Sequence, residues 1–141
     1  MIQFFVGHWT GEGQFSNGKK IAADVAFELS LDSSWLIYTH RDKAPNSYKA
    51  DSYWGVDGPT GEFIANCFDN FQGHRLFASD GWKNGKMVLT DHAFLTGVGT
   101  YFEHFRYEKL SEKSFKMSYE TSRDGITWSL GDELVFTKTG S

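Results

Sequence analysis

The feature that most constrains this chain is the alternation of apolar and polar residues in short segments, with turn signals between them about every ten residues. The clearest segment is 21–31, in which every second residue from Ile21 to Leu31 is apolar. A period of two places these side chains on one face of a strand, where they can all be buried. Only the first six residues offer any sign of a helical period. The pattern predicts an all-β protein in which Met1 to Val6 form a short helix or turn.

Turn residues separate the expected strands. Asn17-Gly18 is typical of a two-residue hairpin turn, and Asp57-Gly58-Pro59 marks a strand end. Residues 91–99 do not fit a clear pattern, and Gly97-Val98-Gly99 is expected to form a loop. The expected strands are 7–15, 21–31, 35–41, 48–56, 62–69, 74–79, 86–90, 101–109, 115–120 and 128–138.

This succession of hairpins limits the topology. Consecutive hairpins favour a single antiparallel meander. So many strands with one apolar face either split into a sandwich or close into a barrel, and a single meander favours closure. With 141 residues the chain is long enough to build a full core in one domain, residues 1–141. We therefore expect one closed antiparallel barrel of about ten strands.

The stretch Gly7-His8-Trp9-Thr10-Gly11-Glu12-Gly13 combines glycines with a tryptophan at two-residue spacing. In a strand, Trp9, Gly11 and Gly13 share one face, while the opposite face is polar. Glycines inside a strand mark a bend or a close backbone approach, as where a sheet curls into a barrel. We expect Trp9 to pack inside one end of the barrel.

Charge and cysteine content exclude several classes of protein. Fourteen basic and 18 acidic residues give a net charge of -4, and no basic run exceeds Lys19-Lys20, so nucleic acid and anionic membranes are poor partners. Cys67 is the single cysteine, which excludes an intrachain disulfide and suits a reducing compartment. No apolar run reaches the length of about 18 residues that a membrane helix needs, and Met1 to Val6 are too short for a signal peptide. We expect a cytoplasmic monomer or homodimer.

Four motifs carry a resemblance to known proteins. They are Gly7-x-Trp9-x-Gly11-x-Gly13, the aromatic segment 35–41, Gly55-Val56-Asp57, and Ser122-Arg123-Asp124-Gly125-Ile126-Thr127-Trp128. In this order they resemble a bacterial family of unknown function with a lipocalin-like barrel and, more distantly, nitrobindin, a ten-stranded haem-binding barrel. The likeness extends over nearly the whole chain. It implies a closed calycin-type barrel, like those of lipocalins and fatty-acid-binding proteins, with an internal cavity and no established chemistry.

Several kinds of reactive site find no support in the residue spacing. Cys67 has no adjacent histidine or basic residue and is expected to be an inert core thiol. The serines lack the Gly-x-Ser-x-Gly context of a hydrolase, and no glycine-rich phosphate loop opens a helix. No two histidines occur at i,i+2 or i,i+4, so no strand presents a metal-binding pair, although His40 and His104 could meet across a barrel. The histidines are His8, His40, His74, His92 and His104.

The aromatic content favours a ligand cavity, since five Trp, six Tyr and 13 Phe exceed what a small core requires. In segment 101–109 both faces carry polar groups. Arg106, if buried, would need an internal carboxylate or an anionic ligand group as its partner, and the alternative places it with His104 in solvent. The expected ligand-binding residues are Tyr38, His40, Trp54, Asn66, Phe68, His104 and Arg106.

Three classes of function remain open. A carrier or sensor of a small apolar or amphipathic molecule is preferred, because it requires only a cavity and a few polar anchors. An isomerase- or hydrolase-like enzyme would need acidic residues to converge in the cavity. A dimerisation module would have a filled interior and an exposed apolar patch. The acidic candidates are Glu12, Asp69, Asp80, Glu103 and Asp132.

The distant likeness to nitrobindin raises the possibility of haem, whose iron that family holds through a histidine on its final strand. The matching segment here, 128–136, has no histidine, and Asp132 or Glu133 would be a poor substitute. Haem is therefore disfavoured unless His40, His92 or His104 reaches the iron. No cofactor and no metal are expected.

Overall fold

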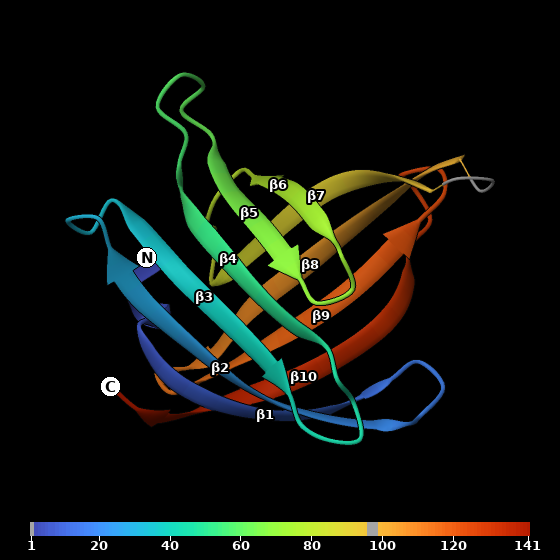
Figure 1. Cartoon of the computed structure of the whole chain (residues 1–141), viewed down its shortest axis with the longest axis horizontal. Helices are drawn as coiled ribbons and strands as arrows, with labels where there is room; N and C mark the ends of the chain where they lie inside the picture. The colour runs from blue at the N-terminus through green and yellow to red at the C-terminus, as the bar shows by residue number, and fades with distance from the viewer. Residues whose placement is uncertain (1, 96–98) are drawn as a thin grey trace.

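Ten antiparallel strands close into a barrel in the computed structural model, which describes residues 2–95 and 99–141 (Figure 1). Each strand pairs with the next in the chain, and β1 pairs with β10 to complete the ring. This confirms the predicted all-β meander. The strands are β1 (Gly7–Phe15), β2 (Lys20–Ser30), β3 (Trp35–Asp42), β4 (Lys49–Val56), β5 (Phe63–Asp69), β6 (His74–Ser79), β7 (Lys86–Leu95), β8 (Gly99–Ser111), β9 (Ser114–Ser122) and β10 (Ser129–Gly140).

The observed boundaries differ from the expected ones mainly around residues 91–99. β7 continues to Leu95 and pairs with β8, which begins at Gly99. Gly97 and Val98 of the expected loop lie outside the described residues. A 3-10 helix, η1 (Ile2–Phe5), agrees with the predicted helix or turn at the N-terminus. Within residues 2–95 and 99–141, no helix is long and apolar enough to cross a membrane.

The glycines of the first strand lie where the barrel closes. A Cβ on Gly11 would lie 2.5 Å from the Phe136 ring, and one on Gly13 would lie 1.7 Å from the Glu133 carbonyl oxygen of β10. Real Cβ contacts are never so short, so any side chain at these positions would push β1 away from β10. The predicted close backbone approach is confirmed, and it forms the seam between the first and last strands.

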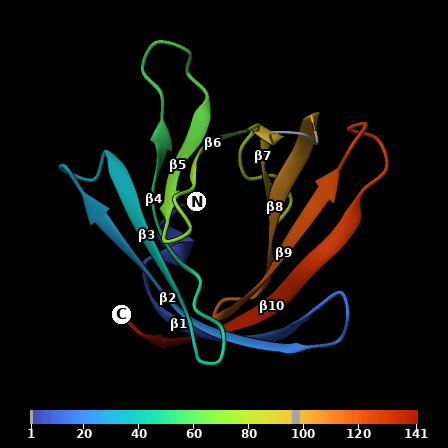
Figure 2. The same cartoon turned by 45° about the vertical axis from the view of Figure 1, so that its right-hand side comes forward.

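η1 lies at one end of the ring of strands (Figure 2). Aromatic side chains fill the barrel at this end. Trp9 is 1% exposed and its ring packs against Phe115 and Phe4. Phe5 is fully buried, and its carbonyl oxygen accepts a 2.8 Å hydrogen bond from Trp9 Nε1. The predicted burial of Trp9 is confirmed. We call this the closed end.

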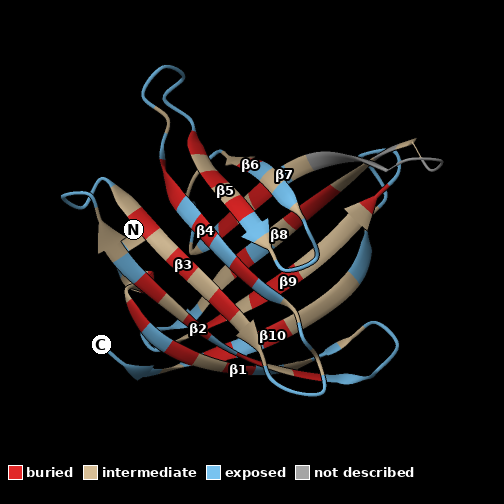
Figure 3. Cartoon of the chain, viewed as in Figure 1, coloured by how far each residue is buried: buried red, intermediate tan, exposed pale blue. Residues whose placement is uncertain are grey.

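Burial alternates along most strands, as the sequence pattern predicts (Figure 3). In β2 the residues from Ile21 to Phe27 at every second position are buried, while Asp24 and Glu28 are exposed. The inner faces therefore form one core inside the ring of strands. At the end opposite η1 this core stops short of filling the barrel, and a cavity remains.

Candidate ligand-binding cavity

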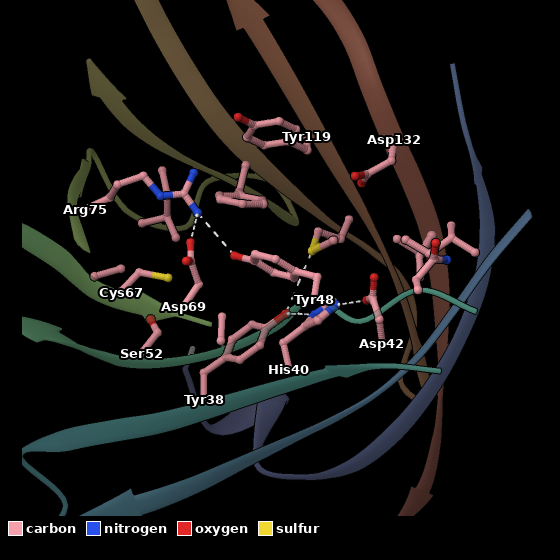
Figure 4. Close-up of a pocket in the computed structure, with 18 of the residues that line it drawn as sticks. Tyr38, His40, Asp42, Tyr48, Ser52, Cys67, Asp69, Arg75, Tyr119 and Asp132 are labelled. Atoms are coloured by element: carbon pink, nitrogen blue, oxygen red, sulfur yellow. Dashed lines mark hydrogen bonds and ion pairs between the residues drawn. The ribbon is translucent and has the colours of Figure 1, made fainter. Parts of the chain in front are cut away.

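The cavity has a volume of about 560 Å³ and lies toward the end of the barrel opposite the closed end. Its floor is apolar and includes Trp54, Phe77, Leu89 and Tyr107. Polar side chains come from strand ends and from the loop between β3 and β4, so they gather toward the mouth (Figure 4). This volume and this division into an apolar floor and a few polar groups are typical of small-molecule sites.

One row of polar groups comes from β3, where Tyr38, His40 and Asp42 alternate onto the inner face. His40 Nε2 lies 2.7 Å from Asp42 Oδ1, and His40 Nδ1 lies 3.1 Å from the Tyr38 hydroxyl. A carboxylate can only accept, so Nε2 carries a proton, and in the neutral imidazole Nδ1 accepts from Tyr38. Burial raises the pKa of Tyr38 well above its ordinary value. The phenol is therefore a neutral donor at physiological pH.

A second polar group surrounds Arg75 on β6. Its Nη1 donates to both carboxylate oxygens of Glu103, at 2.9 and 2.8 Å, and its Nη2 donates to the Tyr48 hydroxyl at 3.1 Å. Asp69 lies 3.5 Å from Nη2, and Tyr119 also donates to Glu103. Burial alone would lower the pKa of Arg75, but the Glu103 carboxylate together with Tyr48 and Cys67 outweighs it, so the pKa is raised. The positive charge is thus neutralised by the protein itself.

Asp132 projects into the cavity from β10, on the side opposite Arg75 (Figure 4). Its Oδ1 atom is buried and has no hydrogen-bond partner among the described residues. Burial raises the pKa of Asp132 to about 6, against the opposing effect of His40, and Asp42 raises it further. A carboxyl group with this pKa changes protonation state near neutral pH and can act as an acceptor or as a donor.

Cys67 and Ser52 also line the cavity, and neither is set up as a nucleophile. Burial raises the pKa of Cys67, although Arg75 opposes this, so the thiol stays protonated near neutral pH. The Ser52 hydroxyl accepts a 2.9 Å hydrogen bond from Trp54 Nε1, and in the described part of the chain no histidine is bonded to it. Covalent catalysis by these groups therefore lacks an activating base.

Three of the seven predicted site residues lie at the cavity. Tyr38, His40 and Trp54 line its wall and floor, where alternation along β3 and β4 places them. Their role in holding a ligand stays a prediction. The other four lie on the outer face of the barrel.

We predicted that Asn66 and Phe68 face the cavity, but both lie on the outer face of the barrel. β5 directs Phe63, Ala65 and Cys67 inward, so Asn66 and Phe68 point outward. There, Asn66 Oδ1 lies 2.9 Å from His74 Nε2, and the Phe68 ring stacks on the same histidine. Each face of this strand carries one phenylalanine, Phe63 inside and Phe68 outside, so the aromatic residues did not distinguish the two faces.

His104 and Arg106 are also outside, because β8 directs Glu103, Phe105 and Tyr107 inward. His104 is nevertheless buried, since its ring stacks on Trp128 with centroids 3.7 Å apart and its Nε2 lies 2.7 Å from Glu120. Arg106 pairs with the same carboxylate at 3.3 Å. The alternative assignment of this strand, with Arg106 outside, is the one observed.

The expected convergence of acidic residues occurs in part. Asp69 and Asp132 line the cavity, and Glu103 lies directly behind Arg75. Glu12 and Asp80 are exposed elsewhere. Sequence reasoning missed Asp42, Tyr48 and Arg75 as site residues. Asp42 continues the alternation of Tyr38 and His40 and could have been found, but nothing in segment 74–79 indicates that Arg75 reaches inward.

The described histidines do not fit a haem site. His40 lines the cavity, yet both of its ring nitrogens already have partners, Tyr38 and Asp42. His104 faces away, and the side chain of His92 lies outside the described part of the chain. A haem iron held by histidine needs an imidazole nitrogen that is free to bind it. Within that described part, no group of three or more His, Cys, Asp or Glu side chains could hold a metal ion.

Comparison with known proteins supports the fold. The crystal structure of Rv2717c from M. tuberculosis matches with a TM-score of 0.66 over 98% of this chain and 94% of that chain, at 11% sequence identity. At this identity the match establishes a shared fold and nothing about the ligand. No family model and no curated protein matches the sequence. The similarity to nitrobindin stays a prediction.

Proposed function

We propose that this protein binds a small apolar or amphipathic molecule in the barrel cavity and acts as its carrier or sensor. The observation that carries the proposal is the cavity of about 560 Å³ with an apolar floor and polar groups toward its mouth. Filled barrels of this size have no such space, and a purely structural module would gain nothing from buried polar side chains at one end. An amphipathic molecule matches both regions.

A second candidate is an enzyme that uses general acid and base catalysis, such as an isomerase. It is favoured by one observation, namely that the His40–Asp42 pair and the partly protonated Asp132 line the same cavity. A carboxyl group that changes protonation state near neutral pH, with a hydrogen-bonded histidine in the same cavity, suits proton transfer on a bound substrate. Hydrolysis through a covalent intermediate has less support, because neither Ser52 nor Cys67 is activated.

Filling the cavity tests the proposal directly. Ala65 faces the cavity beside Trp54, whereas its neighbour Asn66 faces outward, so Ala65→Phe and Asn66→Phe form a matched pair. We expect the uncharged apolar dye N-phenyl-1-naphthylamine to bind the wild type at micromolar concentration and quench tryptophan emission. Ala65→Phe should weaken this binding about tenfold or more, and Asn66→Phe should leave it within about twofold.

Thermal melts show whether each variant folds, and Ala50→Leu replaces Ala65→Phe if that variant does not. Native mass spectrometry of freshly purified protein reports any retained ligand and the oligomeric state. Failure of N-phenyl-1-naphthylamine to bind the wild type, or equal binding by both phenylalanine variants, would show that the cavity is not a binding site.

A further inference from the structure

Arg75, the arginine at the cavity, is not available to a ligand carboxylate. Its two terminal nitrogens are engaged by Glu103, Tyr48 and Asp69. Glu103 has no exposure to solvent, so a ligand cannot displace it without leaving a buried carboxylate unpaired. A fatty acid would therefore find no free cation here. The state of Arg75 therefore argues against an anionic ligand.

The opposite wall has the reverse imbalance, because it holds a carboxyl group that has no donor. Among the described residues, Asp132 Oδ1 is buried and has no hydrogen-bond partner, while Asp42 accepts from His40 Nε2. Around the cavity, four carboxyl groups surround one arginine and one histidine. The carboxyl groups are Asp42, Asp69, Glu103 and Asp132. Tyr38 and Tyr119 donate to His40 and Glu103 instead. Asp132 is therefore the group that needs a donor, and a positively charged one would complement it best.

The positions of these groups also orient a ligand. Asp132 lies near the start of β10 and pairs in register with Tyr119 and Phe15, which both line the cavity. Trp54 and Tyr107 form the floor toward the closed end. A molecule with its polar group at Asp132 would thus extend its apolar part toward these rings.

We propose that the occupant of the cavity is an amphipathic amine, whose protonated nitrogen donates to Asp132, with Asp42 adding negative charge beside it, and whose apolar part lies on the aromatic floor. This inference rests on the proposed function, because it assumes that the cavity holds a ligand. It adds the chemical class of that ligand. No bond is made or broken, and the amine is bound as its cation.

Three probes with the same ten-carbon chain test the ligand class: decylamine, decanoate and decanol. Their affinities are measured by titration calorimetry at about pH 7.5, where Asp132 is ionised. We expect decylamine to bind the wild type about tenfold or more tightly than decanoate, with decanol between them. In Asp132→Asn the preference for the amine should fall to about threefold or less, while decanol affinity changes little.

The matched control is Glu28→Gln, which removes one negative charge from the exposed outer face of β2. It should keep the amine preference, because surface charge acts weakly through water and salt. If Asp132→Asn fails to melt cooperatively, Asp132→Ala takes its place. Decanoate binding as tightly as decylamine, or an unchanged preference in Asp132→Asn, overturns the amine inference and leaves the proposed function standing. Absence of binding by all three probes, when N-phenyl-1-naphthylamine still binds, also overturns it. If this uncharged dye fails too, the proposed function itself is wrong.

Discussion

The two ends of this barrel are built from the same strands, but one end is filled with side chains and the other is hollow. At the closed end, η1 enters the ring of strands, and the rings of Phe5, Trp9 and Phe115 fill the space, with the indole N–H of Trp9 satisfied by a backbone carbonyl. At the opposite end, which we call the open end, the interior is hollow. There Asp132 has a buried oxygen that has no hydrogen-bond partner among the described residues. A chain selected only for stability would treat both ends alike.

The difference indicates where stability and binding are located. Filled aromatic packing gains free energy from buried area and ring contacts, so the closed end holds the barrel together. A hollow with buried polar groups loses both packing and solvation, so the open end costs free energy. Sites where local rules are violated are the expected places for function. Three substitutions, in decreasing order of expected effect, test this division.

The largest effect is expected at the closed end. Trp9→Ala removes a ring that is 1% exposed and contacts Phe115 and Phe4, and it leaves the Phe5 carbonyl oxygen without its donor. The free energy of unfolding should fall by about 3–5 kcal/mol in urea or guanidinium melts. Tyr53→Ala on the outer face is the control, with an expected loss below about 1 kcal/mol. A similar loss for both would contradict the special role of the closed end.

The closed end is also the part of the molecule that the sequence predicted best. Trp9 shares a face with two glycines and the opposite face is polar, so a local pattern determined which side would be buried. The glycines predicted a bend or a close backbone approach, and the structure places that approach between β1 and β10. The strand count and the meander followed from turn residues, which act over only a few positions.

The open end was predicted less well, because its geometry depends on pairs that are distant in sequence. Arg75 and Glu103 are 28 residues apart, and the sequence around either residue gives no sign of the pairing. In β8 both faces carry polar and aromatic residues, so alternation could not choose between Glu103 and His104 as the inward residue. The stacking of Trp128 on His104 likewise depends on residues that are distant in sequence. Local periodicity specifies a strand but not which of two mixed faces is inside.

The second substitution breaks the ion pair between Arg75 and Glu103 near the cavity. Glu103→Gln removes the charge of a fully buried carboxylate that Arg75 binds through two hydrogen bonds. Among the described residues, the guanidinium then keeps only Asp69 as a close counter-charge. We expect a loss of about 3 kcal/mol in the free energy of unfolding, measured by chemical denaturation. Glu112→Gln breaks an exposed pair with Lys109 and should cost less than about 1 kcal/mol.

An additional double variant sharpens this test. Arg75→Met combined with Glu103→Leu removes both buried charges and should recover much of the loss, since apolar residues replace a desolvated pair. Recovery would show that the cost of Glu103→Gln comes from the arginine left without its partner. If the single substitution is harmless, Arg75 is not held as the hydrogen bonds indicate, and a ligand carboxylate could compete for it.

The smallest effect, and the one with opposite sign, is expected from Asp132→Asn at the open end. Burial raises the pKa of Asp132 from 3.8 to about 6, so between these values the folded protein holds a proton that the unfolded chain has released. The contribution of this group to stability is therefore fully present below about pH 4 and is lost as the pH rises through about 6. Asparagine does not ionise and escapes this loss.

The measurement is the difference between the unfolding free energies of the wild type and of Asp132→Asn at each pH. The advantage of asparagine over aspartate should grow by about 2 kcal/mol between about pH 4.5 and pH 7.5. Asp124, whose pKa is lowered to about 2 by backbone N–H donors, acts in the opposite sense at lower pH and cancels in this difference. A difference independent of pH would mean that the Asp132 carboxyl is as well solvated as one on the surface, and the contrast between the two ends would then lie in packing alone.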